Sequence, residues 1–339
     1  DEEALKALAE HFASSVERGD KTSFQDALHL DYADRFGHDR STITDRVFLI
    51  VSEMNNLDVE IEGLQIEELD KTHGYARMFF KVRLNGEGMP RGYAWEEIKR
   101  LGLEPYVAEL DTNGLTVIPP EIACPGDLKS RLLESLLDIA EEEKGFRPDL
   151  ETGANLANYK GRYASEDGQG DSPFGALLQC LVLKGRVFEE ALMNPVHLAM
   201  ATYLCGYSAI LSGMTCFMKG PNETSLDLHS DCFLPDPWPS HAMLSASTYL
   251  LTDFSREDGC TAYVPGSHRL CRRPRPEEVS LDEGGNPNAV PVEGKAGSLV
   301  IWHGNTWHGA YNRTNKGVRV SLNLLLARPH MRTEEDLAD

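Results

Sequence analysis

The residues between about 208 and 328 are divided into short apolar runs, which Gly, Pro and polar residues separate. These runs are rich in the β-branched and aromatic residues that favour strands. The predicted strands are 209–218, 226–231, 244–253, 262–265, 298–302 and 319–327. Many short strands with intervening turns are typical of a closed or two-sheet β architecture such as a jelly roll. We therefore expect a mainly β core in this part of the chain.

Helical periodicity is the dominant signal before this β region. Apolar residues at three- and four-residue spacing predict an amphipathic helix at about 125–144, and a second helical stretch follows near 186–206. A short buried strand is predicted at 113–120, ahead of the first of these helices. The expected fold class is α+β and mainly β, with helices flanking the β core.

Residues 1–88 are predicted to form a small N-terminal α+β domain. Apolar side chains recur at helical spacing in residues 1–55, and the alternation typical of strands replaces this spacing between residues 57 and 84. Turn residues at 71–74 indicate a hairpin. The order of helices followed by a hairpin resembles the small α+β cone of the nuclear-transport-factor-2-like group.

A stretch rich in Gly and other breakers follows this domain and predicts a linker at 89–104. The remaining residues, 105–339, are predicted to form the second domain, which contains the β core. At 339 residues the chain is long enough for two domains of these sizes.

The formal net charge of −21 argues against some classes of partner. An acidic surface repels phosphate backbones and anionic lipids, so we expect neither nucleic acid nor membrane binding. No apolar run is long enough to span a bilayer. The seven cysteines form no C-x-x-C pair, which argues against a zinc knuckle or a disulfide scaffold and favours the reducing cytoplasm. The chain begins at Asp1 rather than Met, so the earlier removal of a leader stays open.

The residue pattern with the clearest chemistry begins at His229 and Asp231. Side chains two positions apart on a strand project from the same face, so these two groups point the same way. Alone, an H-x-D pattern is more typical of a polar strand end. A histidine from a distant strand would complete the two-histidine, one-carboxylate set of mononuclear non-haem iron sites, and the candidates are His303 and His308.

Arg319 lies in an apolar strand whose interior would otherwise exclude a guanidinium group. Burying an unpaired Arg is costly, so its expected partner is an anion. A carboxylate can accept two parallel N–H bonds from a guanidinium group, and the Ser321 hydroxyl can add a donor from the same face of the strand. These residues predict a site for an oxoacid co-substrate beside the metal.

With these motifs, the residues from about 105 to 330 resemble the phytanoyl-CoA dioxygenase family of Fe(II)/2-oxoglutarate-dependent oxygenases. The matching segments are 114–119, 229–231, 253–268, 297–302, 307–310 and 319–321. The resemblance implies a double-stranded β-helix, which is a cupin-like jelly roll, with helices packed on one side. It also implies that Fe(II) is the cofactor and that 2-oxoglutarate and O₂ are co-substrates.

The family pattern places the distal metal ligand in a W-H-G triplet, which in this sequence contains His308. The resemblance therefore implies that His229, Asp231 and His308 are the metal ligands and the catalytic residues. For His303, the resemblance implies a position near the metal or in the wall of the pocket. Related halogenases lack the carboxylate ligand, so the presence of Asp231 implies hydroxylation or another oxidation of a C–H bond, with release of succinate and CO₂.

Further site residues are suggested by the same resemblance and by strand alternation. The predicted co-substrate site includes Arg319, Ser321, Thr248, Gln179 and Thr215. The predicted substrate pocket includes Phe217, Trp238, Trp302 and His303. The polar segments 158–176 and 271–294 are predicted to be either lids over the pocket or solvent-exposed connections.

The expected function is the oxidation of a small organic molecule by an iron- and 2-oxoglutarate-dependent dioxygenase. Two other classes stay open: a cupin-like metal enzyme that does not turn over 2-oxoglutarate, and a non-catalytic binding module in residues 1–85. The N-terminal segment would then mediate homodimer formation or cover an edge of the barrel. Arg319 with Ser321 argues against the cupin-like alternative, because such an enzyme needs no clamp for a carboxylate.

Overall fold

The computed structural model describes most of the chain. The described residues are 2–29, 39–51, 55–70, 75–87, 92–160, 172–235, 238–282 and 284–337. They divide into two compact units, and the division falls between Glu97 and Ile98, within helix α4 (Gly92–Arg100) and inside the predicted linker. The predicted hairpin turn at 71–74 and residues 161–171 of the first predicted lid lie outside the described residues.

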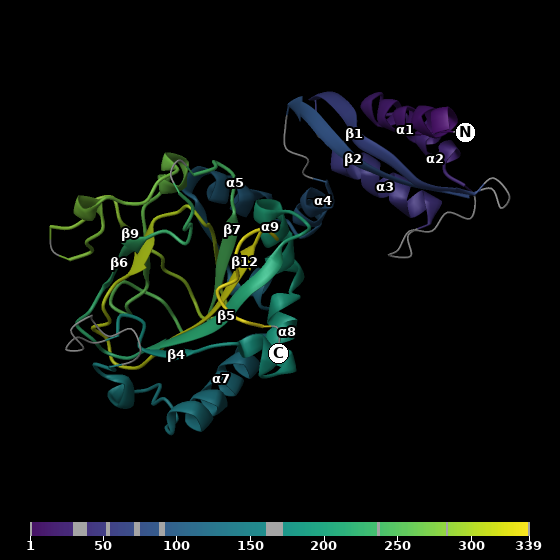
Figure 1. Cartoon of the computed structure of the whole chain (residues 1–339). Coiled ribbons are helices and arrows are strands. Elements are labelled where there is room, and N and C mark those ends of the chain that lie inside the picture. The colour runs from purple at the N-terminus through teal and green to yellow at the C-terminus, as the bar shows by residue number, and fades with distance from the viewer. Residues whose placement is uncertain are drawn as a thin grey trace. The chain divides into compact units, whose positions relative to one another are not determined.

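The first unit consists of helices followed by an antiparallel hairpin (Figure 1). Its elements are α1 (Glu2–Glu17), α2 (Lys21–Ala27), α3 (Arg40–Val51), β1 (Asn55–Asp70) and β2 (Tyr75–Glu87). The buried ring of Phe24 packs edge-to-face against Phe12 and Phe48, with ring centroids 5.1 and 5.6 Å away. The assignment of this first unit to the nuclear-transport-factor-2-like group stays a prediction.

The second unit is built on two antiparallel sheets that face each other (Figure 1). The larger sheet has the strand order β3-β10-β7-β12-β5-β4, and the smaller sheet has the order β6-β11-β8-β9. The strands are β3 (Leu115–Ile118), β4 (Ala176–Leu178), β5 (Ile210–Lys219), β6 (Leu226–His229), β7 (Leu244–Leu250), β8 (Thr261–Tyr263), β9 (Val290–Pro291), β10 (Leu299–His303), β11 (His308–Ala310) and β12 (Arg319–Ala327). The chain passes repeatedly from one sheet to the other, which is the winding of a double-stranded β-helix. The predicted fold class is confirmed.

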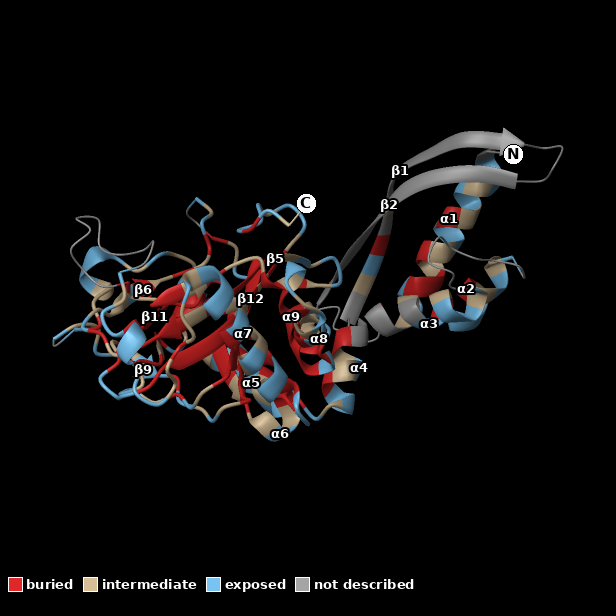
Figure 2. Ribbon diagram, turned by 90° about the horizontal axis from the view of Figure 1, so that it is seen from below, coloured by how far each residue is buried: buried red, intermediate tan, exposed pale blue. Residues whose placement is uncertain are grey.

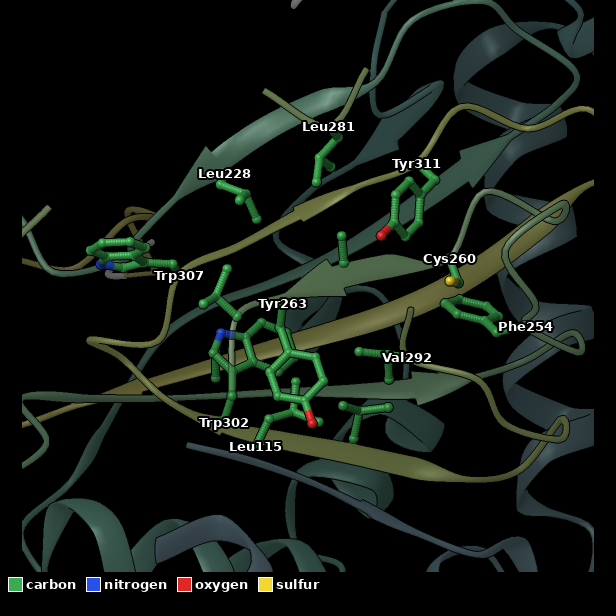
Figure 3. Packing of buried hydrophobic residues seen from close by; sticks show 14 of the residues in the cluster. Leu115, Leu228, Phe254, Cys260, Tyr263, Leu281, Val292, Trp302, Trp307 and Tyr311 are labelled. Carbon is green, nitrogen blue, oxygen red and sulfur yellow. The ribbon is translucent and has the colours of Figure 1, made fainter. Parts of the chain in front are cut away.

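An apolar core holds the two sheets together (Figure 3). Leu115 and Trp302 enter it from the larger sheet, and Leu228 and Tyr263 enter it from the smaller sheet. All four side chains are at least nine-tenths buried. Each fully buried side chain of this size stabilises the fold by roughly 1.5–3 kcal/mol relative to an exposed one. The strand alternation that buries these residues also directs their neighbours to the opposite face.

Helices cover the outer face of the larger sheet. They are α5 (Glu104–Asn113), α6 (Pro120–Ala123), α7 (Leu128–Lys144), α8 (Arg186–Leu192) and α9 (Pro195–Cys205). In Figure 2 their exposed residues face outward and the strands beneath them are buried. α9 packs against β7, β10 and β12, and the Tyr249 hydroxyl of β7 donates a hydrogen bond of 3.0 Å to the main-chain oxygen of Ala191. No described helix combines the length and the apolar character that crossing a membrane requires.

The predicted helical stretch at 186–206 is two helices rather than one. Asn194 interrupts it: its side chain accepts a hydrogen bond from the Val196 N–H and so caps the start of α9. Pro195 occupies the first turn of α9, where the missing N–H costs nothing. Single turns of 3-10 helix also occur among the described residues, at Ala154–Leu156, Leu181–Leu183, Ser267–Leu270 and Pro276–Glu278.

Candidate metal and co-substrate site

Three potential metal ligands converge where β6 and β11 pair. His229 is the last residue of β6 and His308 is the first residue of β11, and the two lie directly opposite each other in the antiparallel register. Asp231 follows His229 by two residues. One ligand atom from each of the three side chains lies within 4.8 Å of the others, and His308 Nε2 is 3.5 Å from Asp231 Oδ1.

Gly309 allows this close approach of the two strands. A Cβ atom on Gly309 would lie 2.3 Å from the main-chain oxygen of Leu226 on β6. Any other residue would therefore push β11 away from β6. The glycine of the W-H-G triplet thus fixes the register that brings His308 opposite His229.

Hydrogen bonds orient all three side chains. The Nδ1 atom of His229 lies 2.9 Å from the Asp227 main-chain oxygen, and that of His308 lies 3.0 Å from the Thr306 main-chain oxygen. A carbonyl can only accept, so each Nδ1 carries the proton and each Nε2 keeps a lone pair for a metal. The Trp302 indole N–H donates to Asp231 Oδ2 at 3.1 Å, which leaves Oδ1 on the side of the histidines.

The electrostatic environment favours the neutral form of the His229 imidazole. Burial lowers the pKa of His229 below its usual value, and the neighbouring His308 adds to this, while the Asp231 carboxylate opposes it. Two neutral imidazoles and one carboxylate form the donor set of a facial triad, which suits Fe(II) and leaves the opposite coordination positions open. The residues present therefore fit a mononuclear iron ion.

Arg319 is buried with an unsatisfied donor. Only 4% of the residue is exposed, its Nη1 atom donates to the Gly259 main-chain oxygen, and its Nε atom has no hydrogen-bond partner among the described residues. Burial lowers the pKa of Arg319 to about 10, so the guanidinium stays charged at neutral pH. A buried, charged donor without a partner is costly unless an anion binds it. The site fits the distal carboxylate of an oxoacid.

A cavity of about 730 Å³ joins the candidate metal ligands to Arg319. The predicted site residues that line it are His229, Asp231, His308, Arg319, Ser321, Thr248, Gln179, Thr215, Phe217 and Trp302. Asn323, which sequence reasoning missed, also lines it. It accepts a hydrogen bond from the Thr248 hydroxyl and donates one of 3.4 Å to Ser321 Oγ, so these polar groups form a connected row on the cavity wall.

Residues 179–321 match the sequence pattern of the phytanoyl-CoA dioxygenase family. The second unit, which contains these residues, belongs to that family. It therefore belongs to the iron- and 2-oxoglutarate-dependent oxygenases. The chain is 29% identical over 240 residues to Dioxygenase af480 of Aspergillus fumigatus, which covers 68% of this chain and 69% of that protein. It is 25% identical to Dioxygenase aneA of Aspergillus aculeatus over 62% of this chain and 70% of that protein.

A solved structure shares the family fold. HygX from Streptomyces hygroscopicus, with nickel, 2-oxoglutarate and hygromycin B bound, aligns with a TM-score of 0.52 and 16% sequence identity. The alignment covers 68% of this chain and 90% of that chain. It shows that the two chains share the double-stranded β-helix fold.

His303 and Trp238 do not line the cavity, contrary to the prediction for the substrate pocket. His303 follows the inward-facing Trp302 on β10, so strand alternation points it the other way. There its Nδ1 accepts a hydrogen bond of 3.1 Å from the Asn305 N–H, and burial lowers its pKa to about 4. Trp238 is buried and donates from Nε1 to the Leu234 main-chain oxygen at 2.8 Å, so it anchors its own loop.

The two segments predicted as lids or connections differ in their relation to the cavity. From 158–176, Phe174 lines it and stacks on Phe217, with ring centroids 4.8 Å apart. None of the described residues of 271–294 lines it. In that segment the Arg272 guanidinium instead forms an ion pair of 2.7 Å with Glu278 and lies over the Trp307 ring. The described part of 271–294 is therefore a connection on the outside of this site.

The C-terminal segment forms a cavity wall that sequence reasoning missed. Residues 330–334 line the cavity. The buried Glu335 carboxylate holds them there, because it accepts hydrogen bonds of 2.8 Å from the main-chain N–H groups of Cys180 and Met214. The sequence gives no signal for this, since a polar stretch after the last strand has the composition of a solvated tail.

Proposed function

We propose that this chain is a non-haem Fe(II)- and 2-oxoglutarate-dependent dioxygenase that hydroxylates, or otherwise oxidises, a C–H bond of a small organic substrate. The observation that carries the proposal is the convergence of His229, Asp231 and His308 on the cavity that also holds Arg319. Membership of the phytanoyl-CoA dioxygenase family and the similarity to two fungal dioxygenases support it.

The proposed metal ligands are His229 Nε2, His308 Nε2 and one oxygen of Asp231. The main-chain oxygens that accept from the two Nδ1 groups fix both imidazoles in orientation and in the tautomer that leaves Nε2 free for a metal. The Trp302 indole holds the carboxylate. Bound to these residues, Fe(II) would supply the chemistry that couples the O₂-dependent decarboxylation of 2-oxoglutarate to the oxidation of the substrate. The protein's own contribution is to fix three ligands on one side and leave the other positions accessible.

The co-substrate is proposed to span the distance between the metal ligands and Arg319. The unsatisfied Nε–H of Arg319 would donate to its distal carboxylate, and the Ser321 hydroxyl lies on the same strand face to add a further bond. Because Arg319 is buried and charged, this carboxylate would be bound out of water, where such bonds are strongest.

The substrate is proposed to occupy the apolar remainder of the cavity. The cavity volume of about 730 Å³ lies in the range that accommodates drug-sized organic molecules. Phe174 and Phe217 contribute a stacked aromatic pair to its wall, and Trp302 lines it beside the metal ligands. These apolar walls would exclude water from the reacting C–H bond and so suppress side reactions. With a net charge of −21 the partner is expected to be a small molecule and not a nucleic acid.

The test is to load the full chain with Fe(II) without oxygen, add 2-oxoglutarate, admit O₂ and measure succinate. The proposal predicts succinate formation that requires iron and stops when a chelator removes it. A screen of small organic molecules should identify compounds that accelerate succinate release and gain one oxygen atom by mass spectrometry. A protein that binds the metal but never releases succinate would favour a metal enzyme without 2-oxoglutarate turnover.

A further inference from the structure

Lys219 is a buried basic residue that the proposed reaction leaves unexplained. It is the last residue of β5, and its side chain is fully buried. Thr215 and Phe217 alternate with it on the strand and line the cavity, so Lys219 emerges on the same inward face. Its Nζ atom donates to the main-chain oxygens of Tyr311, at 2.8 Å, and Thr224, at 3.2 Å.

Lys219 lies directly opposite Arg319 in the antiparallel pairing of β5 with β12. Side chains of such a pair share one face of the sheet, and like charges at these positions destabilise it. Within the described part of the chain, neither side chain forms an ion pair with a carboxylate: their hydrogen bonds go to main-chain oxygens. Two basic groups held together in the protein interior require an anion to be stable as charged groups.

The other titratable groups around this pair do not supply that anion. The Cys260 thiol faces both residues, but burial raises its pKa to about 12, so it is neutral at pH 7. Burial also raises the pKa of the Cys216 thiol beside Arg319, so this thiol is neutral as well. The Asp258 carboxylate lies 3.3 Å from Arg313, a third basic side chain that itself repels Arg319. The interior at this end of β5 and β12 therefore carries an excess of positive charge.

Lys219 is the group that gives up its proton when no anion is present. Burial, and then repulsion from Arg319, lowers the pKa of Lys219 to about 6. The pKa of Arg319 stays near 10, so Arg319 remains charged at neutral pH. A carboxylate that binds beside the pair stabilises the charged form of the amine and raises the pKa of Lys219 again.

We propose that Lys219 is a positioning residue for the co-substrate: with Arg319 it attracts the distal carboxylate of bound 2-oxoglutarate, and it takes up one proton from solvent as the diacid binds. This inference rests on the proposed function, because it requires a diacid in the Arg319 site. Lys219 acts on the carboxylate through its charge and not through a hydrogen bond, because its Nζ atom donates to the main-chain oxygens of Tyr311 and Thr224. The affinity for 2-oxoglutarate is then expected to increase as the pH falls toward the pKa of free Lys219.

The test is anaerobic calorimetric titration of 2-oxoglutarate into the Fe(II)-loaded full chain, in buffers of different ionisation enthalpy between about pH 7.5 and pH 8.5, which lies above the usual pKa of an imidazole. The wild-type protein should take up about one proton per diacid bound at the middle of this range. Lys219→Met should bind 2-oxoglutarate about tenfold more weakly and take up no proton. Lys219→Arg keeps its charge at every pH, so it should restore the affinity and also take up no proton.

The control ligand is 2-oxopentanoate, which has a methyl group in place of the distal carboxyl. Its affinity should be the same in the wild-type protein and in Lys219→Met, because Lys219 acts on the missing carboxylate. A Lys219→Met protein that loses affinity for both ligands alike would overturn the proposal and make Lys219 a structural residue. If Lys219→Met keeps the proton uptake and the 2-oxoglutarate affinity of the wild-type protein, the proposal is also overturned, but the proposed function stays intact. A wild-type protein that takes up neither Fe(II) nor 2-oxoglutarate would instead contradict the proposed function.

Discussion

At the scale of single residues, two histidines five positions apart have different tasks. His308 begins β11 and presents Nε2 toward Asp231, whereas His303 ends β10 and lies beside His268, with ring centroids 5.4 Å apart. Trp302, which precedes His303 on β10, contacts the His308 ring at a centroid distance of 5.1 Å and donates a hydrogen bond to Asp231. One turn of chain thus separates a proposed metal ligand from a buried, neutral core residue.

The matched pair His308→Ala and His303→Ala tests this division. His308→Ala removes one of three ligands and should abolish both Fe(II) retention and succinate formation. His303→Ala should lower the melting temperature, because it leaves a cavity in a buried region, but keep about one iron per chain. Metal analysis of both variants after anaerobic loading gives the result. Loss of iron from His303→Ala alone would show that the ligand assignment is wrong.

Arg319→Leu tests the co-substrate site without touching the metal ligands. Hydrogen bonds between charged groups are worth about 1.5–3 kcal/mol, so the concentration of 2-oxoglutarate at half-maximal rate should rise roughly 10- to 100-fold. The affinity for Fe(II) should stay near that of the wild-type protein, because Arg319 does not belong to the metal cluster. Steady-state succinate measurements and iron titration provide the two values, and an equal loss of both would argue against a clamp.

Not all of these residue roles could be predicted from the sequence. The H-x-D pair and Arg319 stand out because polar groups in apolar strands are costly unless something binds them. Lys219 has no such signal: a lysine at a strand end is usually solvated, and it is buried here only because residues distant in sequence cover it. His303 was predicted to line the pocket. Its neighbour Trp302 faces the cavity instead, and because side chains alternate along a strand, His303 points to the opposite face.

At the scale of secondary structure elements, the longer strands were predictable, but β4, β9 and β11 were not. Periodicity needs several residues, so β5, β7 and β12 were expected close to their observed bounds, whereas β4, β9 and β11 were missed. β11 matters most, because its pairing with β6 places His308 opposite His229. That register depends on the close approach at Gly309, which local sequence patterns do not reveal.

The buried Glu335 carboxylate anchors the C-terminal wall of the cavity together with main-chain hydrogen bonds to Ser212, and Glu335→Gln tests the contribution of the carboxylate. Each carboxylate oxygen accepts one of the two main-chain hydrogen bonds, whereas an amide has one oxygen and an NH₂ group that can only donate. Glu335→Gln therefore loses one of the two bonds, and the free energy of unfolding should fall by about 1–3 kcal/mol. Faster hydrogen exchange at the Cys180 and Met214 amides would show that the wall has loosened. Glu334→Gln is the control, because its side chain accepts no hydrogen bond in the described structure, and it should leave both amides protected. Equal exchange in the two variants would contradict the anchoring role.

At the scale of the whole molecule, the division between Glu97 and Ile98 separates the candidate site from the N-terminal unit. All three proposed metal ligands, Arg319 and the described cavity lining belong to residues 98–339. The N-terminal unit has its own apolar cluster, which includes Val16, Phe24 and Val51. Its role in forming a homodimer or covering a barrel edge stays a prediction from the sequence.

A truncated protein that begins at Gly92 keeps all of α4 and tests whether the second unit is self-sufficient. It should bind one Fe(II) per chain and convert 2-oxoglutarate to succinate at a rate close to that of the full chain. Size-exclusion chromatography of the two proteins reports whether the first unit sets the oligomeric state. A folded truncated protein that cannot bind iron would show that the N-terminal unit completes the site.

The central claim is that His229, Asp231 and His308 hold one iron ion on the cavity in which Arg319 binds a diacid. Anomalous scattering at the iron edge, from crystals of the full chain loaded anaerobically with Fe(II) and 2-oxoglutarate, tests it most directly. We predict one iron peak bonded to these three side chains, with the distal carboxylate of 2-oxoglutarate hydrogen-bonded to Arg319. An iron peak ligated by His303 or by other residues, or a diacid whose distal carboxylate lies away from Arg319, would contradict the account.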